Sequence, residues 1–241
     1  MPLRREVSRV EGFSDAVFAF AITLLVVSLE VPKTFHELMA TIRAFPTFAI
    51  CYLLLFQVWW RHYRFFRKYD LEDNYVIALT GALLFVVLFY VYPLKFLWSL
   101  PFAGLEGRRV TDDIIRLPEV PTLFVIYGAG VVAVFTILGL LYAHAYRRRD
   151  QLGLSAGEAL EARVRVYSNV GVASVGLLSI VAAVLLGAYA PRVVGIAGYM
   201  YGLIGVVEWL VGDYHGRQQK KLATATAAFQ IVPSTKDTSP A

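Results

Sequence analysis

Cysteine, histidine and charged side chains are all scarce in this chain of 241 residues. The single cysteine, Cys51, excludes an internal disulfide framework, and its place inside an apolar run is typical of a small buried hydrophobe. The four histidines are not spaced like metal ligands and have no cysteine cluster beside them. The sequence therefore predicts no metal site.

Residue patterns of catalysis are missing as well. The sequence holds no Gly-rich phosphate loop, whether of the P-loop or of the dinucleotide-binding kind. Serines within apolar runs, such as Ser174 and Ser179, have no base nearby that could activate them as nucleophiles. We therefore expect no catalytic residue, no cofactor and no enzymatic activity.

Only 17% of the residues are charged and 58% are hydrophobic, whereas about a quarter of the residues in a soluble domain are charged. The apolar residues form long runs, which is the pattern of a protein that crosses the bilayer several times. The net charge of +5 comes from basic residues in the gaps between these runs. That placement suits membrane topology and anionic lipid, so no nucleic acid partner is expected.

Six runs are long enough to cross a membrane as helices, which are the only plausible spanning element for segments without alternating polarity. The predicted fold is therefore an all-α integral membrane protein with six transmembrane helices. The expected spans are 13–31, 43–62, 74–98, 120–146, 165–190 and 193–212. Residues 1–215 then form one membrane domain, and 216–241, rich in Ala, Thr, Ser and Pro, form a disordered cytoplasmic tail.

The distribution of basic residues predicts the orientation. Of the 23 lysines and arginines, 16 fall in the N-terminus, the second-to-third loop, the fourth-to-fifth loop and the tail. The positive-inside rule places these segments in the cytoplasm, with both termini, in a multi-pass protein of the cell membrane. The loop at 99–119 then lies outside.

Polar side chains at specific depths of the spans are candidate functional groups. Ser14 and Asp15 stand at the entry of the first span, where they could equally cap the helix. Phe20, Thr23, Leu24 and Val27 share one helix face by their spacing, a pattern that ordinary helix packing also produces. Glu208 in the sixth span is expected to pair with an arginine of the cytoplasmic segments.

Two stretches resemble a known family. The first, RVEGFSDAVFAFAITLL at 9–25, is similar to the first-helix motif of the transmembrane protein 175 family of potassium channels, in its single-repeat prokaryotic type. The second stretch places Trp59, His62, Arg64 and Phe66 as in the family's second helix. The remaining segments match the family in layout.

The resemblance implies a homotetramer of six-helix subunits that passes K⁺ ions through the bilayer along a pore lined by the first helices. Apolar rings form the constriction in place of a carbonyl filter. Carried over to this sequence, the narrow ring is Phe20, the threonine associated with potassium preference is Thr23, and further rings are Leu24 and Val27. Phe20 departs from the smaller aliphatic residue usual in the family, so a ring of phenylalanines would narrow the pore or close it by dewetting.

The remaining motif residues are expected to hold the first helix in place. We predict that Ser14 and Asp15 connect its inner end to Arg9, Trp59 or His62, and that Phe18 packs away from the pore. The whole predicted network is Arg9, Phe13, Ser14, Asp15, Trp59 and His62.

Two other functions fit the sequence. A proton- or cation-coupled secondary transporter would use Asp15 or Glu208 as its ion site, although the paired repeats with broken helices typical of transporters are not visible. A non-conducting membrane scaffold would use small residues such as Gly198 and Gly202 for helix contacts.

Overall fold

The computed structural model of the chain describes residues 7–27, 31–103, 114–190 and 195–230. Most of these residues are helical, and no strand occurs among them, so the all-α prediction is confirmed. The elements are α1 (Arg9–Val27), α2 (Phe35–Arg43), α3 (Phe45–Tyr69), α4 (Asn74–Phe102), the short helix η1 (Leu117–Glu119), α5 (Val120–Arg147), α6 (Ala156–Tyr189), α7 (Ile196–Tyr199), η3 (Met200–Gly202) and α8 (Leu203–Gln230).

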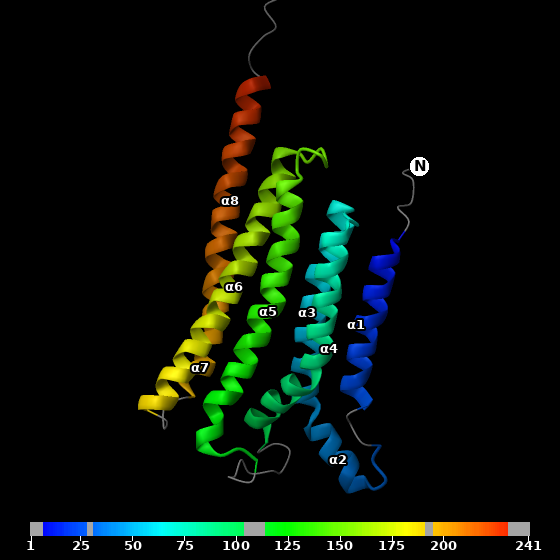
Figure 1. Ribbon diagram of the computed structural model, residues 1–241, viewed down its shortest axis with the longest axis vertical. Coiled ribbons are helices and arrows are strands. Elements are labelled where there is room, and N and C mark those ends of the chain that lie inside the picture. Colours follow the sequence, from blue (N-terminus) through cyan, green and yellow to red (C-terminus); the bar gives the residue numbers. More distant parts are fainter. Residues whose placement is uncertain (1–6, 28–30, 104–113, 191–194, 231–241) are drawn as a thin grey trace, which may run out of the picture.

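The long helices lie side by side in one bundle (Figure 1). The start of α1, the turn at 70–73, the turn at 148–155 and the C-terminal half of α8 lie at the same end of this bundle. We call this the basic end, because Arg9, Arg147–Arg149 and the lysines at 220 and 221 belong to these segments. The structure thus gathers at one end the segments that carry most of the positive charge in the sequence.

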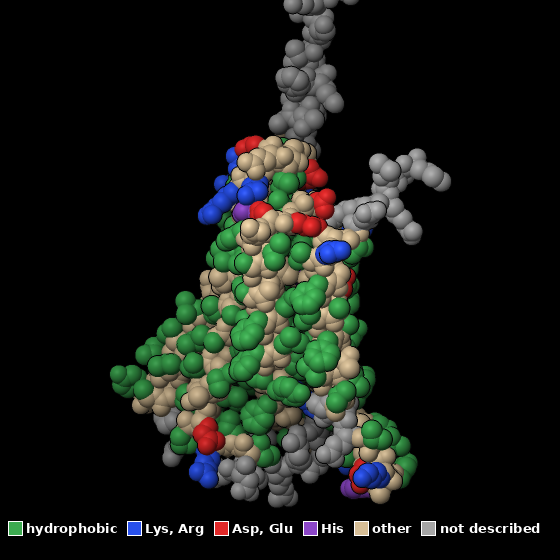
Figure 2. Space-filling model, turned by 45° about the vertical axis from the view of Figure 1, so that its right-hand side comes forward, with side chains coloured by type: hydrophobic (Ala, Val, Ile, Leu, Met, Phe, Trp, Pro, Cys, Tyr) green, Lys and Arg blue, Asp and Glu red, His purple; other side chains and the backbone are tan. Residues whose placement is uncertain are grey.

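The apolar lengths support membrane insertion. By length and composition, four helices can cross a membrane, namely α1, α4, α5 with η1, and α6. The pair α2 and α3 would add a fifth, although the two helices are bent by 45° with respect to each other. On the face in Figure 2, charged side chains gather toward the two ends and hydrophobic side chains cover the middle. The described residues therefore give four or five candidate spans, where the sequence predicts six.

The sixth predicted span differs most from the structure. Part of it, residues 191–194, lies outside the described residues, and α7, η3 and α8 follow in succession from Ile196. Glycine weakens helix formation, and Gly195, Gly198 and Gly202 all fall in this interrupted stretch.

The predicted tail is also partly wrong. Helix α8 continues to Gln230, so residues 216–230, expected to be disordered, are helical. The run RQQKKLATATAA at 217–228 contains mostly good helix formers, and no Gly or Pro follows Gly216 until Pro233. A helix that has already begun can extend through such a run because propagation is easier than nucleation. Residues 231–241 of the predicted tail lie outside the described residues.

The core lies between α1, α3, α4 and α5, and α6 packs along α5 with α8 beside it. Aromatic rings dominate the core near the basic end. Phe65 contacts Tyr142 edge to face with ring centroids 5.5 Å apart, and Tyr69 meets the same tyrosine at 5.9 Å. These contacts join α3 to α5 and fix the position of α3, which in turn supports α1.

Candidate functional site

Helix α1 has one buried face and one exposed face in the subunit. The buried face consists of Glu11, Ser14, Phe18, Ala21 and Leu25. The exposed face carries Phe13, Ala16, Phe20, Thr23 and Val27. Both sets repeat at intervals of three and four residues, as two stripes of one helix do. Four of the sequence-predicted residues, Phe13, Phe20, Thr23 and Val27, therefore lie on the exposed stripe, and Leu24 is half-buried at its edge.

Ser14 and Asp15 do not cap α1, because the helix begins at Arg9. The backbone N–H of Glu11 instead donates to Ser8 Oγ over 3.1 Å, so Ser8 satisfies one of the free donors of the first turn. Ser14 is buried, and its hydroxyl donates to the carbonyl of Val10 over 2.7 Å within the same helix. The capping role predicted for these two residues is therefore corrected.

Asp15 connects α1 to α3. The indole Nε1–H of Trp59 donates to Asp15 Oδ1 over 2.8 Å. The indole itself is held by stacking on Tyr63, with ring centroids 5.3 Å apart. Trp59 is one of the partners that the sequence predicts for Asp15, whereas Arg9 is exposed at the first position of α1. A hydrogen bond to a carboxylate is among the stronger ones in proteins.

His62 takes a different position from the one predicted. Its ring lies in the core, 1% exposed, 5.8 Å from the ring of Phe18 and 4.8 Å from that of Phe66. Its Nε2 atom has no hydrogen-bond partner within the described part of the chain. His62 therefore supports α1 by packing on Phe18, and Phe18 turns away from the exposed stripe.

Two features define the chemistry of the exposed stripe. Phe20 is 55% exposed and Val27 is 70% exposed in the subunit. The Thr23 hydroxyl donates to the carbonyl of Ala19 over 2.9 Å. A hydroxyl that donates to its own helix keeps lone pairs free to accept. The oxygen of Thr23 can therefore accept a further contact from the exposed side without losing its backbone hydrogen bond.

Arg61 joins three helices. Its guanidinium donates to Glu208 Oε1 over 2.7 Å, to Ser168 Oγ over 3.2 Å and to Asn169 Oδ1 over 3.3 Å. It also lies over the ring of Phe135, 5.3 Å from the centroid. The sequence predicts that Glu208 pairs with an arginine, and the structure identifies that arginine as Arg61. The roles of Ser168 and Asn169 have no signal in the sequence because they depend on how α6 faces α3.

Asp73 holds the basic end together. It caps α4 by accepting from the N–H of Val76 at 3.0 Å, and its other oxygen contacts His144 Nε2 at 2.7 Å and Arg148 at 3.2 Å. Partial burial raises the pKa of Asp73, but the contacts with His144, Val76 and Arg148 outweigh it and leave the pKa lowered.

Metal binding has no support in the residues that the structure describes, because no three side chains of His, Cys, Asp or Glu come together there. The site is an exposed apolar stripe with one threonine on α1. The hydrogen bond from Trp59 to Asp15 and the ring contact between Phe18 and His62 hold this helix against α3.

Comparison with known proteins identifies the family of the chain. Residues 9–90, which hold α1 and α3, match the family described as the endosomal/lysosomal potassium channel TMEM175. A potassium channel of Marivirga tractuosa is 37% identical over 226 residues, which are 90% of this chain and 91% of that protein. The chain belongs to the TMEM175 family.

Further TMEM175 relatives agree. A potassium channel of Chamaesiphon minutus is 31% identical over 154 residues, covering 60% of this chain and 68% of that relative. The crystal structure of a variant of the potassium channel MtTMEM175, bound to a nanobody-MBP fusion protein, matches with a TM-score of 0.78 at 35% identity, over 88% of this chain and 95% of that one. A homologue of the lysosomal potassium-selective channel TMEM175, from Chamaesiphon minutus, shares the fold, with a TM-score of 0.53 at 20% identity, over 84% and 96% of the two chains.

These findings confirm the family resemblance that the sequence motifs carry. TMEM175 relatives are named as channels and not as enzymes, which agrees with the expectation drawn from the missing catalytic patterns.

Proposed function

We propose that the chain forms a potassium-permeable cation channel in the cell membrane, as a homotetramer with both termini in the cytoplasm. The observation that carries the proposal is its 37% identity to a potassium channel over almost the whole length of both proteins. The basic end of the bundle would face the cytoplasm, in line with the positive-inside rule. The six predicted spans would then include α8 together with the four or five spans that length and composition support.

The exposed stripe of α1 is proposed as the pore lining. Large apolar side chains at this degree of exposure mark a surface that contacts lipid, another subunit or a dewetted pore. A helix face that contacts only lipid does not need a fixed rotation, whereas the hydrogen bond from Trp59 to Asp15 holds α1 in one orientation. Asp15 and Trp59 would fix the rotation of α1, and this rotation decides which side chains face the axis.

Phe20 is proposed as the narrow ring, with Thr23, Leu24 and Val27 beyond it. Four phenylalanine rings around one axis exclude water and raise the barrier for a hydrated ion. If the rings turn their faces inward, each can stabilise a partly dehydrated cation by roughly 0.5–2 kcal/mol. Thr23 would offer a hydroxyl oxygen to the same ion one turn further along α1.

The transporter alternative requires a carboxylate that gains and loses an ion. Asp15 accepts from Trp59, and Glu208 is paired with Arg61 and accepts from Ser168. These fixed partners favour structural roles for both carboxylates. A scaffold would need neither Thr23 nor a conducting path, so a flux measurement separates it from the channel.

The test is rubidium uptake into liposomes that contain the purified full-length protein, driven by a valinomycin-controlled potential. We expect uptake by the wild type. We expect faster uptake by Phe20→Ile, because four smaller isoleucine side chains would leave a wider constriction than four phenylalanines. The matched control is Phe85→Ile, the same change at a residue of α4 that is 73% exposed, where we expect the wild-type rate.

The outcomes separate the candidates. Uptake by Phe20→Ile but not by the wild type would identify a pore closed by the phenylalanine ring. Saturating uptake that follows a pH gradient would point to the transporter. Failure of both proteins to take up rubidium would contradict the channel.

A further inference from the structure

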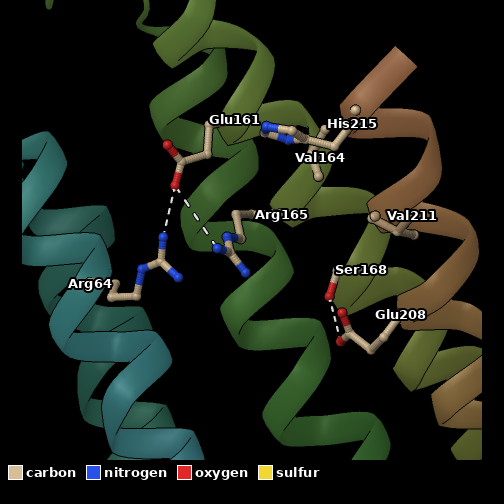
Figure 3. Close-up of a pocket in the computed structure, with 10 residues that line it drawn as sticks. Arg64, Glu161, Val164, Arg165, Ser168, Glu208, Val211 and His215 are labelled. Atoms are coloured by element: carbon tan, nitrogen blue, oxygen red, sulfur yellow. Dashed lines mark hydrogen bonds and ion pairs between the residues drawn. The ribbon is translucent and has the colours of Figure 1, made fainter. Parts of the chain in front are cut away.

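A polar pocket of about 450 Å³ lies between α3, α6 and α8 near the basic end, on elements other than the candidate pore helix (Figure 3). Its volume falls within the range of small-molecule sites, roughly 300–1,000 Å³. The residues around it are Arg64, Glu161, Val164, Arg165, Ser168, Glu208, Val211, Gly212, His215 and Gly216.

The two carboxylates of the pocket are already engaged by basic side chains. Glu161 accepts from Arg64 over 3.0 Å and from Lys68, and Arg165 lies 4.0 Å from it. Glu208 is held by Arg61 at 2.7 Å and by Ser168 at 2.8 Å.

These contacts leave positive charge in excess. Four basic side chains, those of Arg61, Arg64, Lys68 and Arg165, contact two carboxylates. Arg64 and Arg165 line the pocket, whereas Arg61 and Lys68 hold the same two carboxylates from beside it. The described cluster around the pocket therefore carries a surplus of positive charge, which favours an anion over a cation.

Arg165 is the cation least committed to a partner. Its contact with Glu161, at 4.0 Å, is the longest of these ion pairs, and Glu161 has two closer cations. Figure 3 shows the guanidinium of Arg165 between Glu161 on one side and the Ser168–Glu208 pair on the other. A planar guanidinium in such a position can bind two oxygens of one phosphoryl group.

Helix α8 leaves room for a ligand. At Gly212 and Gly216 no heavy atom of the described residues comes within 4 Å of the point where a Cβ would stand. His215, between them in sequence, extends from α8 toward α6 (Figure 3). The N-terminal part of α8 also exposes apolar side chains, with Val206 50% and Trp209 68% exposed. A charged group in the pocket and a hydrocarbon chain along α8 would thus each find a matching surface.

We propose that this pocket binds a phosphoryl anion, with Arg165 and Arg64 as its contacts. The same chemistry is offered by the headgroup of an anionic phospholipid and by free phosphate. The inference does not rest on the proposed channel, because it concerns α3, α6 and α8 and its test measures binding.

The test is a thermal-unfolding titration of the full-length protein in detergent at constant ionic strength. The probes are phosphatidylglycerol, inorganic phosphate and, as a zwitterionic control, phosphatidylcholine. We expect phosphatidylglycerol, phosphate or both to raise the unfolding midpoint. We expect Arg165→Gln to weaken the apparent affinity at least about tenfold, which corresponds to ~1.4 kcal/mol.

Two further variants make the test specific. Arg163→Gln removes the same charge from an exposed position on α6, where Arg163 lies over the ring of Tyr146, and should keep the wild-type affinity. Gly212→Leu fills the pocket from α8 without changing its charge and should also weaken binding. It decides the question if Arg165→Gln does not fold.

A response to phosphatidylglycerol alone would identify a lipid headgroup as the ligand, and a response to phosphate as well would identify the phosphoryl group itself. The proposal is overturned if neither anion shifts the midpoint more than phosphatidylcholine does. It is also overturned if Arg163→Gln weakens binding as much as Arg165→Gln.

Discussion

At the scale of single residues, the hydrogen bond from Trp59 to Asp15 is the clearest link between the sequence motif and the structure. We predict that Trp59→Phe lowers the unfolding free energy by about 1.5–3 kcal/mol, since it removes a donor to a carboxylate while keeping an aromatic ring. The neighbouring Trp60, 45% exposed, provides the control variant Trp60→Phe. Equal midpoints for the two variants in thermal unfolding would show that the Asp15 contact does not stabilise the fold.

Asp73 gives a second prediction at this scale. Because the pKa of Asp73 is lowered in the fold, the folded protein binds fewer protons there than the unfolded chain. Its stabilising effect is therefore fully present above the ordinary pKa of an aspartate and is lost as the pH falls through the lowered value. Asp73→Asn keeps an N-cap side chain but loses the negative charge that His144 and Arg148 contact. The variant should therefore be less stable than the wild type at neutral pH.

The measurement for Asp73 is the unfolding midpoint as a function of pH. The difference between the wild type and Asp73→Asn should shrink on acidification. Asp150→Asn, at an exposed position of the next turn at the same end, should run parallel to the wild type. A constant difference between Asp73→Asn and the wild type over the acidic range would count against the ionic role.

Residue partners were predictable only where a motif limited the choice. The motif left few candidates for Asp15, and Trp59 was among them. The cap predicted at Ser14 and Asp15 is wrong because the charged and glycine positions of residues 9–12 predict a span that begins at residue 13, whereas the helix starts before the apolar run does. His62 was expected in the Asp15 network because it belongs to the second-helix motif at the same end of the membrane, but its ring contacts with Phe18 and Phe66 place it in the core.

At the scale of elements, α1 offers two phenylalanines two positions apart on opposite faces. Phe18 is 2% exposed and Phe20 is 55% exposed. We predict that Phe18→Ala costs about 3–5 kcal/mol of stability because it opens a cavity against His62. Phe20→Ala should cost far less, since it removes few contacts within the subunit. Thermal unfolding of the two variants checks this, and equal losses would mean that the two faces of α1 are wrongly assigned.

The pair α5 and α6 depends on a close backbone approach. A Cβ added at Gly128 of α5 would stand 2.9 Å from the carbonyl oxygen of Gly176 on α6 and 2.3 Å from a side-chain carbon of Ile180. Gly128→Ala should therefore destabilise the protein by about 1–3 kcal/mol, because a backbone atom cannot move aside as a side chain can. Gly81→Ala on α4, where the described residues leave space, should be neutral or slightly stabilising. A neutral result for Gly128→Ala in thermal unfolding would contradict the close approach.

Helix positions followed from the sequence where an apolar run had clear ends. The third and fourth runs predict helices from 74 and 120, and α4 and α5 begin at these residues. The end of α8 was less predictable, because its apolar part is short and its polar continuation is a run of good helix formers. Helix α2 was not predicted, since the second span is expected to begin at residue 43, and so the bend between α2 and α3 at Ala44 was not predicted either.

At the scale of the whole molecule, the orientation in the membrane can be measured with the native cysteine left in place. Cys51 is fully buried, so an added cysteine at an exposed site gives the only expected signal with a membrane-impermeant maleimide. We predict that Asp150→Cys reacts in inverted vesicles and that His36→Cys reacts in intact cells. The reverse pattern would place the basic end outside the cell and contradict the predicted topology.

The position of α3 between two anchors has a mechanical consequence. Trp59 holds α1 from one side of α3, and Arg61, two residues later and about 200° around the helix, holds α6 and α8 from the other. Rotation of α3 about its own axis would carry the two contacts in opposite directions and strain both, whereas sliding along the axis moves them together. Helix α3 therefore links the position of α1 to that of α6 and α8, and the hydrogen bond from the Tyr142 hydroxyl to the carbonyl of Arg61 ties the same helix to α5.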